Sequence, residues 1–285
     1  MPEGDTLFRT ARTLHRALAG QAITRFEAAH AHLVRVDDDA PLVGRHVERV
    51  EARGKHLLMW FSGGPGGEAL VLRTHMRMSG SWHIYRVGES WRRPASQARI
   101  VIGTAAWVTV AFTVAEAEFV AAGDIDRHAR LRRLGPDLLS PDFDADAAVS
   151  NLRALGALPI GEALLRQHAV AGAGNVFKSE VLFLCRVNPA VRVGALSDET
   201  LRAIVGRART LLAANVTDTS RDGIGTYAGL RRTTRRSDPG ARLWVYGRRG
   251  QPCRQCGTPI ASAKQGVEAR VTYWCPNCQA FGEQV

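Results

Sequence analysis

The sequence predicts an α+β protein with an N-terminal β-sandwich, a helical domain and a C-terminal zinc ribbon. Short runs of apolar and β-branched residues, separated by turn residues, fill the region between residues 23 and 114. Apolar residues then recur with helical spacing between residues 145 and 216. Four cysteines near the end follow the pattern C-x2-C-x18-C-x2-C, a spacing typical of zinc ribbons. A length of 285 residues suits about two domains and a small third module.

The first predicted element is a helix that leads into the β-sandwich. Leu7, Leu14 and Leu18 fall on one helical face, and Gly20 ends the helix. The strands that follow are short and are bounded by glycine- and proline-rich turns, which favours a sandwich or barrel-like sheet. We expect them at residues 23–28, 46–52, 56–61, 69–76, 81–87, 98–103 and 107–114.

The remaining chain divides into a linker, a helical domain and a ribbon. We place the boundaries at 1–130 for the β-sandwich, 131–144 for a proline- and aspartate-containing linker, 145–243 for the helical domain and 244–285 for the ribbon. Within the helical domain, residues 218–242 are rich in arginine and lack periodicity, so they are predicted to form a flexible loop. The predicted helices are 147–155, 160–170, 175–185 and 197–216.

The charge of the chain points to a polyanionic partner. The 38 Lys and Arg residues outnumber the 27 Asp and Glu residues, which gives a formal charge of +11. Residues 221–285 contain 11 of these basic residues and 4 of the acidic ones, so seven of the eleven excess charges lie there. A basic chain suits nucleic acid or an anionic membrane surface. No apolar run long enough for a membrane span, no signal peptide and no basic amphipathic helix with an aromatic face is present in the sequence, so we expect no membrane partner.

The four C-terminal cysteines predict one structural Zn²⁺ site. Two tight turns supply four thiolates, from Cys253, Cys256, Cys275 and Cys278. These thiolates occupy all four positions of a tetrahedral zinc ion. Two disulfides or an iron–sulfur centre are the alternatives, and a chain without a secretion signal disfavours disulfides. The fifth cysteine, Cys185, lies in an apolar run and is interpreted as a buried helical thiol.

The extreme N-terminus is the first candidate for chemistry. Removal of the initiator methionine leaves Pro2 with a secondary amine, which can attack an electrophilic sugar carbon and form an iminium. Glu3 follows directly and can move protons beside that amine. The alternative is structural, because proline and glutamate also begin a helix well.

Two further candidates belong to the predicted β-sandwich. Lys55 is one of only three lysines in a chain with 35 arginines, and it precedes a strand, where a solvated edge residue is the ordinary interpretation. Met76 and Met78 lie at a strand end near a glycine turn. Such methionines are ordinarily core residues, although an exposed one can wedge into a base stack.

Two candidates lie in the C-terminal half. A glycine-rich turn at 171–174 enters a helix that Asn175 can cap, an arrangement that suits a DNA phosphate or an ordinary helix connection. Arg270 lies on the predicted ribbon hairpin, where it can enter a groove, touch a phosphate or remain a solvated charge.

Five motifs in order along nearly the whole chain resemble the Fpg/Nei family of DNA glycosylases. They are MPEGDT, GKHLL, HMRMSGSW, AGAGNVFKSE and VYGRRGQPCRQCGTPI…TYWCPNC, and MPEGD is similar to the endonuclease VIII (Nei) branch. The resemblance implies a β-sandwich, a helix-two-turn-helix domain and a zinc ribbon. It also implies a monomeric, cytoplasmic enzyme of the bacterial nucleoid. Its partner would be double-stranded DNA that contains oxidised bases or abasic sites.

The resemblance also implies a bifunctional DNA glycosylase/AP lyase of base excision repair. Pro2 would attack C1′ of the damaged nucleotide to form a Schiff base, and Glu3 would protonate the sugar ring oxygen. Lys55 would act in β-elimination or hold the adjacent phosphate, and Arg270 would assist δ-elimination and grip the lesion phosphates. The same resemblance assigns Asn175 to the DNA backbone and Met78 to the gap that a flipped base leaves.

One departure bears on the substrate. The formamidopyrimidine branch has an Arg-Arg-Phe-Gly segment, and the matching stretch here is VAEAEFVAAGD. The arginine that would face the orphan base is missing, so we expect oxidised pyrimidines, although HMRMSGS is more similar to that same branch. The alternatives are an oxidised-purine (8-oxoguanine/formamidopyrimidine) glycosylase and a catalytically silent zinc-ribbon protein that binds damaged DNA.

Overall fold

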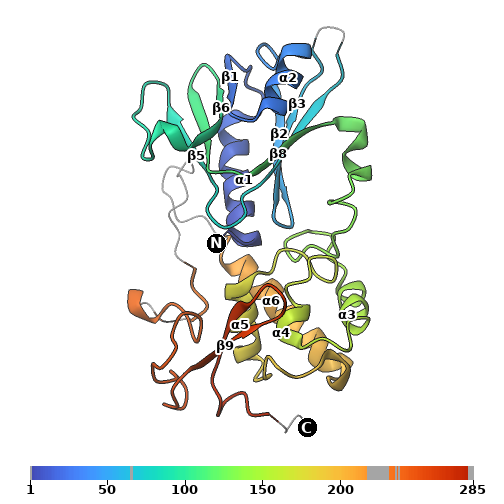
Figure 1. Ribbon diagram of the computed structural model, residues 1–285, viewed down its shortest axis with the longest axis vertical. Helices are drawn as coiled ribbons and strands as arrows, with labels where there is room; N and C mark the ends of the chain where they lie inside the picture. Colours follow the sequence, from blue (N-terminus) through green and yellow to red (C-terminus); the bar gives the residue numbers. More distant parts are fainter. Residues whose placement is uncertain (1, 65–66, 217–230, 235, 237, 282–285) are drawn as a thin grey trace. The chain divides into compact units, whose positions relative to one another are not determined.

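The chain forms two compact units in the computed structural model, which describes residues 2–64, 67–216, 231–234, 236 and 238–281. The first unit comprises Met1–Arg132 and Val216–Ala228, and the second comprises Arg133–Asn215 and Gly229–Val285. Figure 1 shows the helices and strands of the chain. Each unit has its own hydrophobic core. Most of the predicted flexible loop at 218–242 lies outside the described residues.

The first unit is the predicted β-sandwich. Two four-stranded antiparallel sheets have the strand orders β1-β6-β7-β5 and β2-β3-β4-β8. Apolar side chains from both sheets meet in one core, as alternating strand patterns predict. The strands are β1 (Arg25–Ala28), β2 (Val47–Arg53), β3 (His56–Phe61), β4 (Leu70–His75), β5 (Ser81–Arg86), β6 (Ala98–Gly103), β7 (Trp107–Phe112) and β8 (Glu116–Ala121).

The leading helix α1 (Gly4–Leu18) packs against this sandwich (Figure 1). Leu7, Leu14 and Leu18 are buried in the sandwich core, which confirms the apolar face expected from the sequence. Burial of each such leucine stabilises the fold by about 1.5–3 kcal/mol, so α1 is fixed firmly. The start of this helix, and Pro2 with it, is therefore held at a defined place on the sandwich.

Two elements of the first unit were not expected from the sequence. Helix α2 (Ala31–Asp39) buries only Leu33, so its apolar pattern is weak. Strand β8 alternates Glu116 and Glu118 with apolar residues, and the glutamates form ion pairs that a single sequence does not reveal. Short 3-10 helices η1 (Ala95–Gln97) and η2 (Ala122–Arg127) flank these strands.

The second unit contains the predicted helices. The side chains of Asp144 and Ser197 accept hydrogen bonds from backbone N–H groups at the starts of α3 and α6. These caps fix the N-terminal end of each helix. The expected helix at 160–170 is shorter than predicted, because only its first turn is α-helical. The elements are α3 (Ala145–Arg153), α4 (Ile160–Ala163), α5 (Asn175–Leu184), η3 (Val193–Ala195), α6 (Asp198–Ala214) and η4 (Pro239–Ala241).

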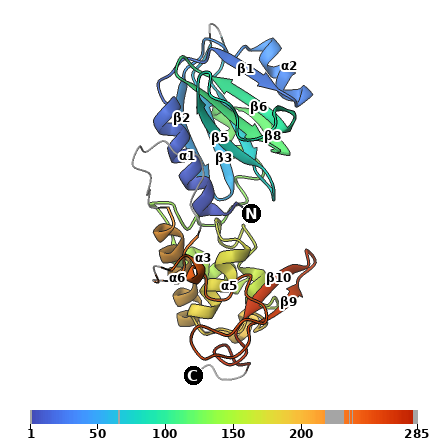
Figure 2. The same cartoon turned by 90° about the vertical axis from the view of Figure 1, so that its left-hand side faces the viewer.

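The ribbon hairpin belongs to the same unit as the helices. Strands β9 (Ala261–Gln265) and β10 (Arg270–Trp274) pair antiparallel, and β10 packs against α5 (Figure 2). The predicted linker is also packed into this unit from residue 133 onward, because Leu138 is fully buried in the helical core. None of the helices in the described part of the chain has the length and apolar character of a membrane span.

Candidate functional site

Pro2 and Glu3 lie immediately before α1, so the start of this helix sets their position. The carbonyl of Glu3 accepts the backbone N–H groups of Thr6 and Leu7 at 2.9 and 3.1 Å, so Glu3 forms the N-terminal boundary of the helix. Its side chain is fully buried, whereas Pro2 is half-buried. A buried carboxyl at the positive end of a helix is well placed for proton transfer near the adjacent residue.

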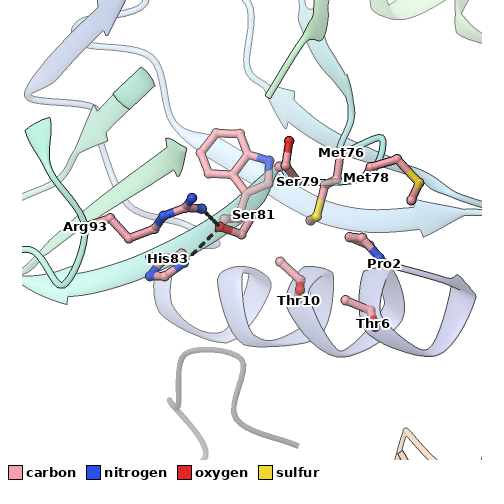
Figure 3. A pocket seen from close by; sticks show the side chains of 11 residues that line it. Pro2, Thr6, Thr10, Met76, Met78, Ser79, Ser81, His83 and Arg93 are labelled. Atoms are coloured by element: carbon pink, nitrogen blue, oxygen red, sulfur yellow. Dashed lines mark hydrogen bonds between the residues drawn. The ribbon is translucent and has the colours of Figure 1, made fainter. Parts of the chain in front are cut away.

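Pro2 lines a pocket of about 240 Å³ that lies within the first unit. Figure 3 shows Pro2, Met76 and Met78 at one end of this pocket and Ser81, His83 and Arg93 at the other. The volume is below the roughly 300–1,000 Å³ of sites for drug-sized ligands, so the pocket suits a small ring system. The residues that line it are Pro2, Thr6, Thr10, Met76, Met78, Ser79, Gly80, Ser81, Trp82, His83 and Arg93.

The turn between β4 and β5 presents Met78 to this pocket. Met78 is 58% exposed, while Met76 is buried at 2% and belongs to the core. Gly80 is required for the tight turn, because a Cβ there would lie 2.5 Å from the carbonyl oxygen of Met76. The two methionines therefore have different environments, and Met78 is the one available to a ligand.

The far end of the pocket is polar and connected by hydrogen bonds. Arg93 Nη1 donates to Ser81 Oγ at 3.0 Å, and Ser81 Oγ lies 2.9 Å from His83 Nε2 (Figure 3). Burial, and then the charges of Arg93 and Arg92, lower the pKa of His83, so its ring is neutral at pH 7. We call Ser81, His83 and Arg93 the polar wall of the pocket. Sequence reasoning missed the polar wall, because Arg93 comes from a loop without any recognisable sequence pattern.

Lys55 lies in the turn between β2 and β3 rather than in the pocket. Gly54 has a φ of +58°, which makes the two-residue Gly54-Lys55 turn between Arg53 and His56 accessible. Burial is the main cause that lowers the pKa of His75 to about 4, and the positive charge of Lys55 contributes. Lys55 is thus close to His75, the residue that precedes the pocket-lining Met76.

A buried polar network, which sequence reasoning also missed, extends from this turn. Arg73 is 2% exposed; it donates to His56 Nδ1 at 2.8 Å and forms an ion pair with Glu118. His128 Nε2 lies 3.1 Å from the same carboxylate. The signal in the sequence was a single arginine within the otherwise uncharged strand β4, between Leu72 and Thr74. A buried guanidinium requires a carboxylate partner.

In the second unit, the structure brings Asn175 and the ribbon hairpin together. Gly174 is the N-cap of α5, so the expectation that Asn175 caps this helix is wrong. Asn175 is instead the first helical residue, and its Nδ2 donates to the carbonyl of Val271 at 2.7 Å. Val271 follows Arg270, whose guanidinium Nη2 lies 2.9 Å from Glu268 Oε2. Asn175 and Arg270 therefore lie at one joint between α5 and the hairpin.

The four cysteines fit a single zinc ion. Their sulfur atoms all lie within 4.8 Å of one another, with 3.9 Å between Cys253 and Cys278 and 3.4 Å between Cys256 and Cys275. A tetrahedron with Zn–S bonds near 2.3 Å places its sulfurs roughly 3.8 Å apart. Backbone N–H groups point at two of these sulfurs, as in thiolate knuckles. Because all four positions are protein ligands, the zinc is structural.

Models of three family domains match the chain. The formamidopyrimidine-DNA glycosylase N-terminal domain matches residues 1–131, the H2TH domain of the same glycosylase matches 134–226, and the zinc finger found in FPG and IleRS matches 250–280. The chain therefore belongs to the formamidopyrimidine-DNA glycosylase/endonuclease VIII family, which confirms the resemblance of its motifs.

Curated relatives match along the whole chain. A probable endonuclease 8 2 of Streptomyces coelicolor is 42% identical over 98% of this chain and 94% of the relative. Endonuclease 8 2 of Mycobacterium tuberculosis is 40% identical over 98% of this chain and all of its own length. The relative from Mycolicibacterium smegmatis, 39% identical over 98% of this chain and 99% of its own length, is named DNA-(apurinic or apyrimidinic site) lyase Nei2.

Solved structures share the fold. The Lactococcus lactis Fpg in complex with DNA that contains an abasic site superposes with a TM-score of 0.79 at 23% identity, covering 98% of this chain and all of that one. MutM in complex with DNA that contains carbocyclic 8-oxo-G gives the same TM-score at 22% identity, with the same coverage. At these identities the likeness concerns the fold alone.

Proposed function

We propose that this protein is a bifunctional DNA glycosylase/AP lyase that removes oxidised bases and then cleaves the DNA strand. The observation that supports the proposal most directly is Pro2 at one end of a base-sized pocket with the buried Glu3 beside it. The names of the relatives, endonuclease 8 and DNA-(apurinic or apyrimidinic site) lyase, agree with this activity.

In the first stage the unprotonated amine of Pro2 attacks C1′ of the damaged nucleotide. The N–C1′ bond forms, the glycosidic bond breaks, and the base departs with a proton. Glu3 protonates the ring oxygen O4′, so the sugar opens and the amine becomes an iminium at C1′. Proline suits this role, because a secondary amine that forms an iminium remains positively charged and acts as an electron sink.

In the second stage the iminium makes strand cleavage possible. Loss of a proton from C2′ expels the 3′ phosphate by β-elimination, and a further proton loss expels the 5′ phosphate by δ-elimination. Water then hydrolyses the iminium and releases Pro2. We assign Lys55 to the first elimination or to the neighbouring phosphate, and Arg270 to the second elimination and to the lesion phosphates.

DNA binding is assigned to both units. In the second unit, Asn175 would hold the backbone, and its hydrogen bond to β10 supports a fixed position near Arg270. In the first unit, Met78 would fill the gap left by the everted base, and its exposure supports this role. Phosphate contacts release counterions, so affinity should fall steeply with salt. We further propose that the protein acts as a monomer on double-stranded DNA of the bacterial nucleoid, in the cytoplasm.

Among oxidised bases we propose that pyrimidines are preferred. The stretch that would contain the orphan-base arginine of the formamidopyrimidine branch lies on β8, where Glu116 and Glu118 instead bind arginines of this unit. The relatives at about 40% identity are named endonuclease 8 rather than formamidopyrimidine-DNA glycosylase. Excision of thymine glycol or 5-hydroxyuracil should exceed excision of 8-oxoguanine from matched duplexes; the opposite order would identify an oxidised-purine enzyme.

Borohydride trapping with an abasic-site oligonucleotide tests the proposed function. The wild-type protein should form a covalent adduct and cleave the strand, and Pro2→Gly should form far less adduct. A folded wild-type protein that binds this DNA without an adduct would be a silent damage-binding protein. Equal trapping by Pro2→Gly would show that another amine is the nucleophile.

A further inference from the structure

At the polar end of the pocket, burial determines which atoms donate hydrogen bonds and which accept them. Tyr85 is 1% exposed; its hydroxyl oxygen accepts the backbone N–H of Arg92 at 3.2 Å and lies 3.2 Å from His83 Nδ1. Within the described part of the chain, the hydroxyl has no other hydrogen-bond partner. Its own hydrogen must therefore point at His83 Nδ1, because a buried hydroxyl hydrogen without an acceptor is unfavourable.

This donation determines where the hydrogen of the neutral His83 ring lies. Burial lowers the pKa of His83, so the ring has one hydrogen, and with Nδ1 as acceptor that hydrogen is on Nε2. Nε2 then donates to Ser81 Oγ across 2.9 Å. Arg93 Nη1 donates to the same oxygen across 3.0 Å. The two lone pairs of Ser81 Oγ are thus both occupied by protein donors.

Ser81 consequently acts as a donor toward the pocket. A hydroxyl has two lone pairs and one hydrogen, so a Ser81 oxygen that accepts two N–H groups has its hydrogen left for a ligand. The adjacent guanidinium of Arg93 has five N–H groups and no acceptor. Both side chains line the pocket, and both lie at the end away from Pro2 (Figure 3). This end can therefore bind an acceptor such as a carbonyl oxygen and disfavours an amino group.

We propose that Ser81, oriented by His83 and Tyr85 and supported by Arg93, is a specificity-determining residue that selects everted pyrimidines with a carbonyl oxygen at C4. The inference rests on the proposed function, because it takes the pocket as the site of the damaged base. It deepens that function by naming the class of base: oxidised uracil- and thymine-type rings, in preference to cytosine-type rings with a 4-amino group.

The position of the polar wall explains why it contacts the substituent at C4 of the base. In a pyrimidine nucleotide, N1 bonds to C1′, and C4 lies directly across the ring from N1. Attack by Pro2 requires C1′ at the Pro2 end of the pocket, so the C4 substituent points to the opposite end. Ser81 and Arg93 are located there. An amino group at C4 would face two donors, and one hydrogen bond would be replaced by a repulsive contact.

A matched pair of lesions tests the selection. 5-Hydroxyuracil and 5-hydroxycytosine differ in the C4 group and in the N3 hydrogen that accompanies it. Single-turnover excision rates are measured in the same duplex context, and the change in their ratio when Ser81 is replaced isolates the contact at C4. The wild-type protein should excise 5-hydroxyuracil about 10-fold faster, the factor expected for one hydrogen bond. Equal rates, faster excision of 5-hydroxycytosine, or excision of neither base would overturn the proposal.

Three variants test whether the polar wall causes the preference for 5-hydroxyuracil over 5-hydroxycytosine. Ser81→Ala should bring the ratio of the two rates close to one, mainly by slowing 5-hydroxyuracil. Tyr85→Phe removes the donor that determines the His83 hydrogen, so it should reduce the ratio although Tyr85 does not line the pocket. Ser96→Ala, an exposed serine of η1 on the same unit, should retain the wild-type ratio. Wild-type ratios in both Ser81→Ala and Tyr85→Phe would contradict the proposal that the polar wall determines the preferred base.

Cleavage of an abasic-site oligonucleotide separates this inference from the proposed function. An abasic site has no base to read, so Ser81→Ala should slow excision of 5-hydroxyuracil much more than it slows cleavage of the abasic site. If Ser81→Ala loses this cleavage as strongly as it loses base excision, Ser81 supports the fold and not the specificity. If the wild-type protein neither traps nor cleaves an abasic site, the proposed function itself fails.

Discussion

Two glutamates, one in each unit, are fully buried, and their surroundings differ completely. Glu3 lies at the start of α1 beside a pocket residue, where its neighbours include the half-buried Pro2. Glu180 lies within α5, where it accepts a hydrogen bond from the hydroxyl of Thr233 and from three successive backbone N–H groups at residues 244–246. These N–H groups belong to the segment that leads into the zinc ribbon.

The comparison shows that burial of a carboxylate does not by itself indicate its role. Glu180 is enclosed by donors that fix the chain between α5 and the ribbon, and Trp244 of this segment stacks on Phe183 of α5 with 5.4 Å between ring centroids. Glu3 is buried next to space that a ligand can enter. We therefore expect Glu3 to act in chemistry and Glu180 to act in stability.

The largest expected effect is on base excision by Glu3→Gln. Removal of a general acid slows a reaction by about 10²–10⁴-fold, so single-turnover excision of 5-hydroxyuracil should fall at least about 100-fold. Cleavage of an abasic site should be affected much less, because its sugar already opens without the acid. The exposed Glu48→Gln on β2 is the matched control. Excision by Glu3→Gln at the rate of this control would show that Glu3 is structural.

Glu180→Gln should instead destabilise the second unit. An amide cannot accept all four hydrogen bonds, and its NH₂ group would face donors, so we expect a loss of about 3 kcal/mol. Urea unfolding followed by amide hydrogen exchange in α5 and α6 measures the change in the second unit, with the exposed Glu199→Gln as control. Excision per folded molecule should remain. A stable Glu180→Gln that has lost activity would reverse the assignment of the two glutamates.

Zinc removal should affect the second unit and leave the stability of the first unit unchanged. Chelation, or Cys275→Ala, removes the ion that holds the two turns of the ribbon together, so the affinity for DNA should fall at least about 10-fold. Abasic-site cleavage should fall with it. The first unit contains none of the zinc ligands, and its thermal unfolding should not change. Full DNA affinity without zinc would place Arg270 and the hairpin away from DNA.

The smallest effect is a pH dependence that belongs to the first unit. Burial is the main cause that lowers the pKa of His56 to about 2 and of His75 to about 4. The unfolded chain binds these protons near pH 6.5, so the stability that neutral burial provides is complete above pH 6.5 and decreases as the pH falls below it. For each histidine the slope rises to about 1.4 kcal/mol per pH unit once the pH is well below 6.5, where the unfolded histidine is fully protonated.

Replacement of one histidine identifies this source. His56→Gln retains an acceptor for Arg73 but does not titrate, so urea unfolding between pH 7 and 5.5 should show an average slope smaller by about 0.8 kcal/mol per pH unit. An unchanged slope would assign the acid sensitivity to other groups. In the second unit the only histidine is His168, which is exposed.

The features that the sequence predicted are those with local patterns. Regular apolar spacing identifies α1, the strands from β1 to β7 and α6, and the spacing of cysteines identifies the zinc site. The N-terminal Pro2-Glu3 pair is also local. Helix α2 was missed because its three terminal aspartates obscure a face that buries only Leu33.

The features that the sequence could not predict depend on residues brought together by folding. The polar wall joins Ser81 of β5 to Arg93, which lies twelve positions further along the chain. Arg73 obtains its carboxylate from Glu118, 45 positions away. The incorrect cap at Asn175 has the same origin, since its side chain binds Val271 across 96 positions instead of its own helix. Pairing of distant residues needs the register of the sheet, which a single sequence does not contain.

The most direct test of the account identifies the residue that forms the covalent adduct. The protein is incubated with an abasic-site oligonucleotide, reduced with borohydride, digested and analysed by mass spectrometry. We predict that the adduct is on the N-terminal peptide that begins with Pro2. The chain has only three lysines, Lys55, Lys178 and Lys264, so the competing amines are few. An adduct on any of them, with an unmodified N-terminal peptide, would contradict the assignment of Pro2 as the nucleophile.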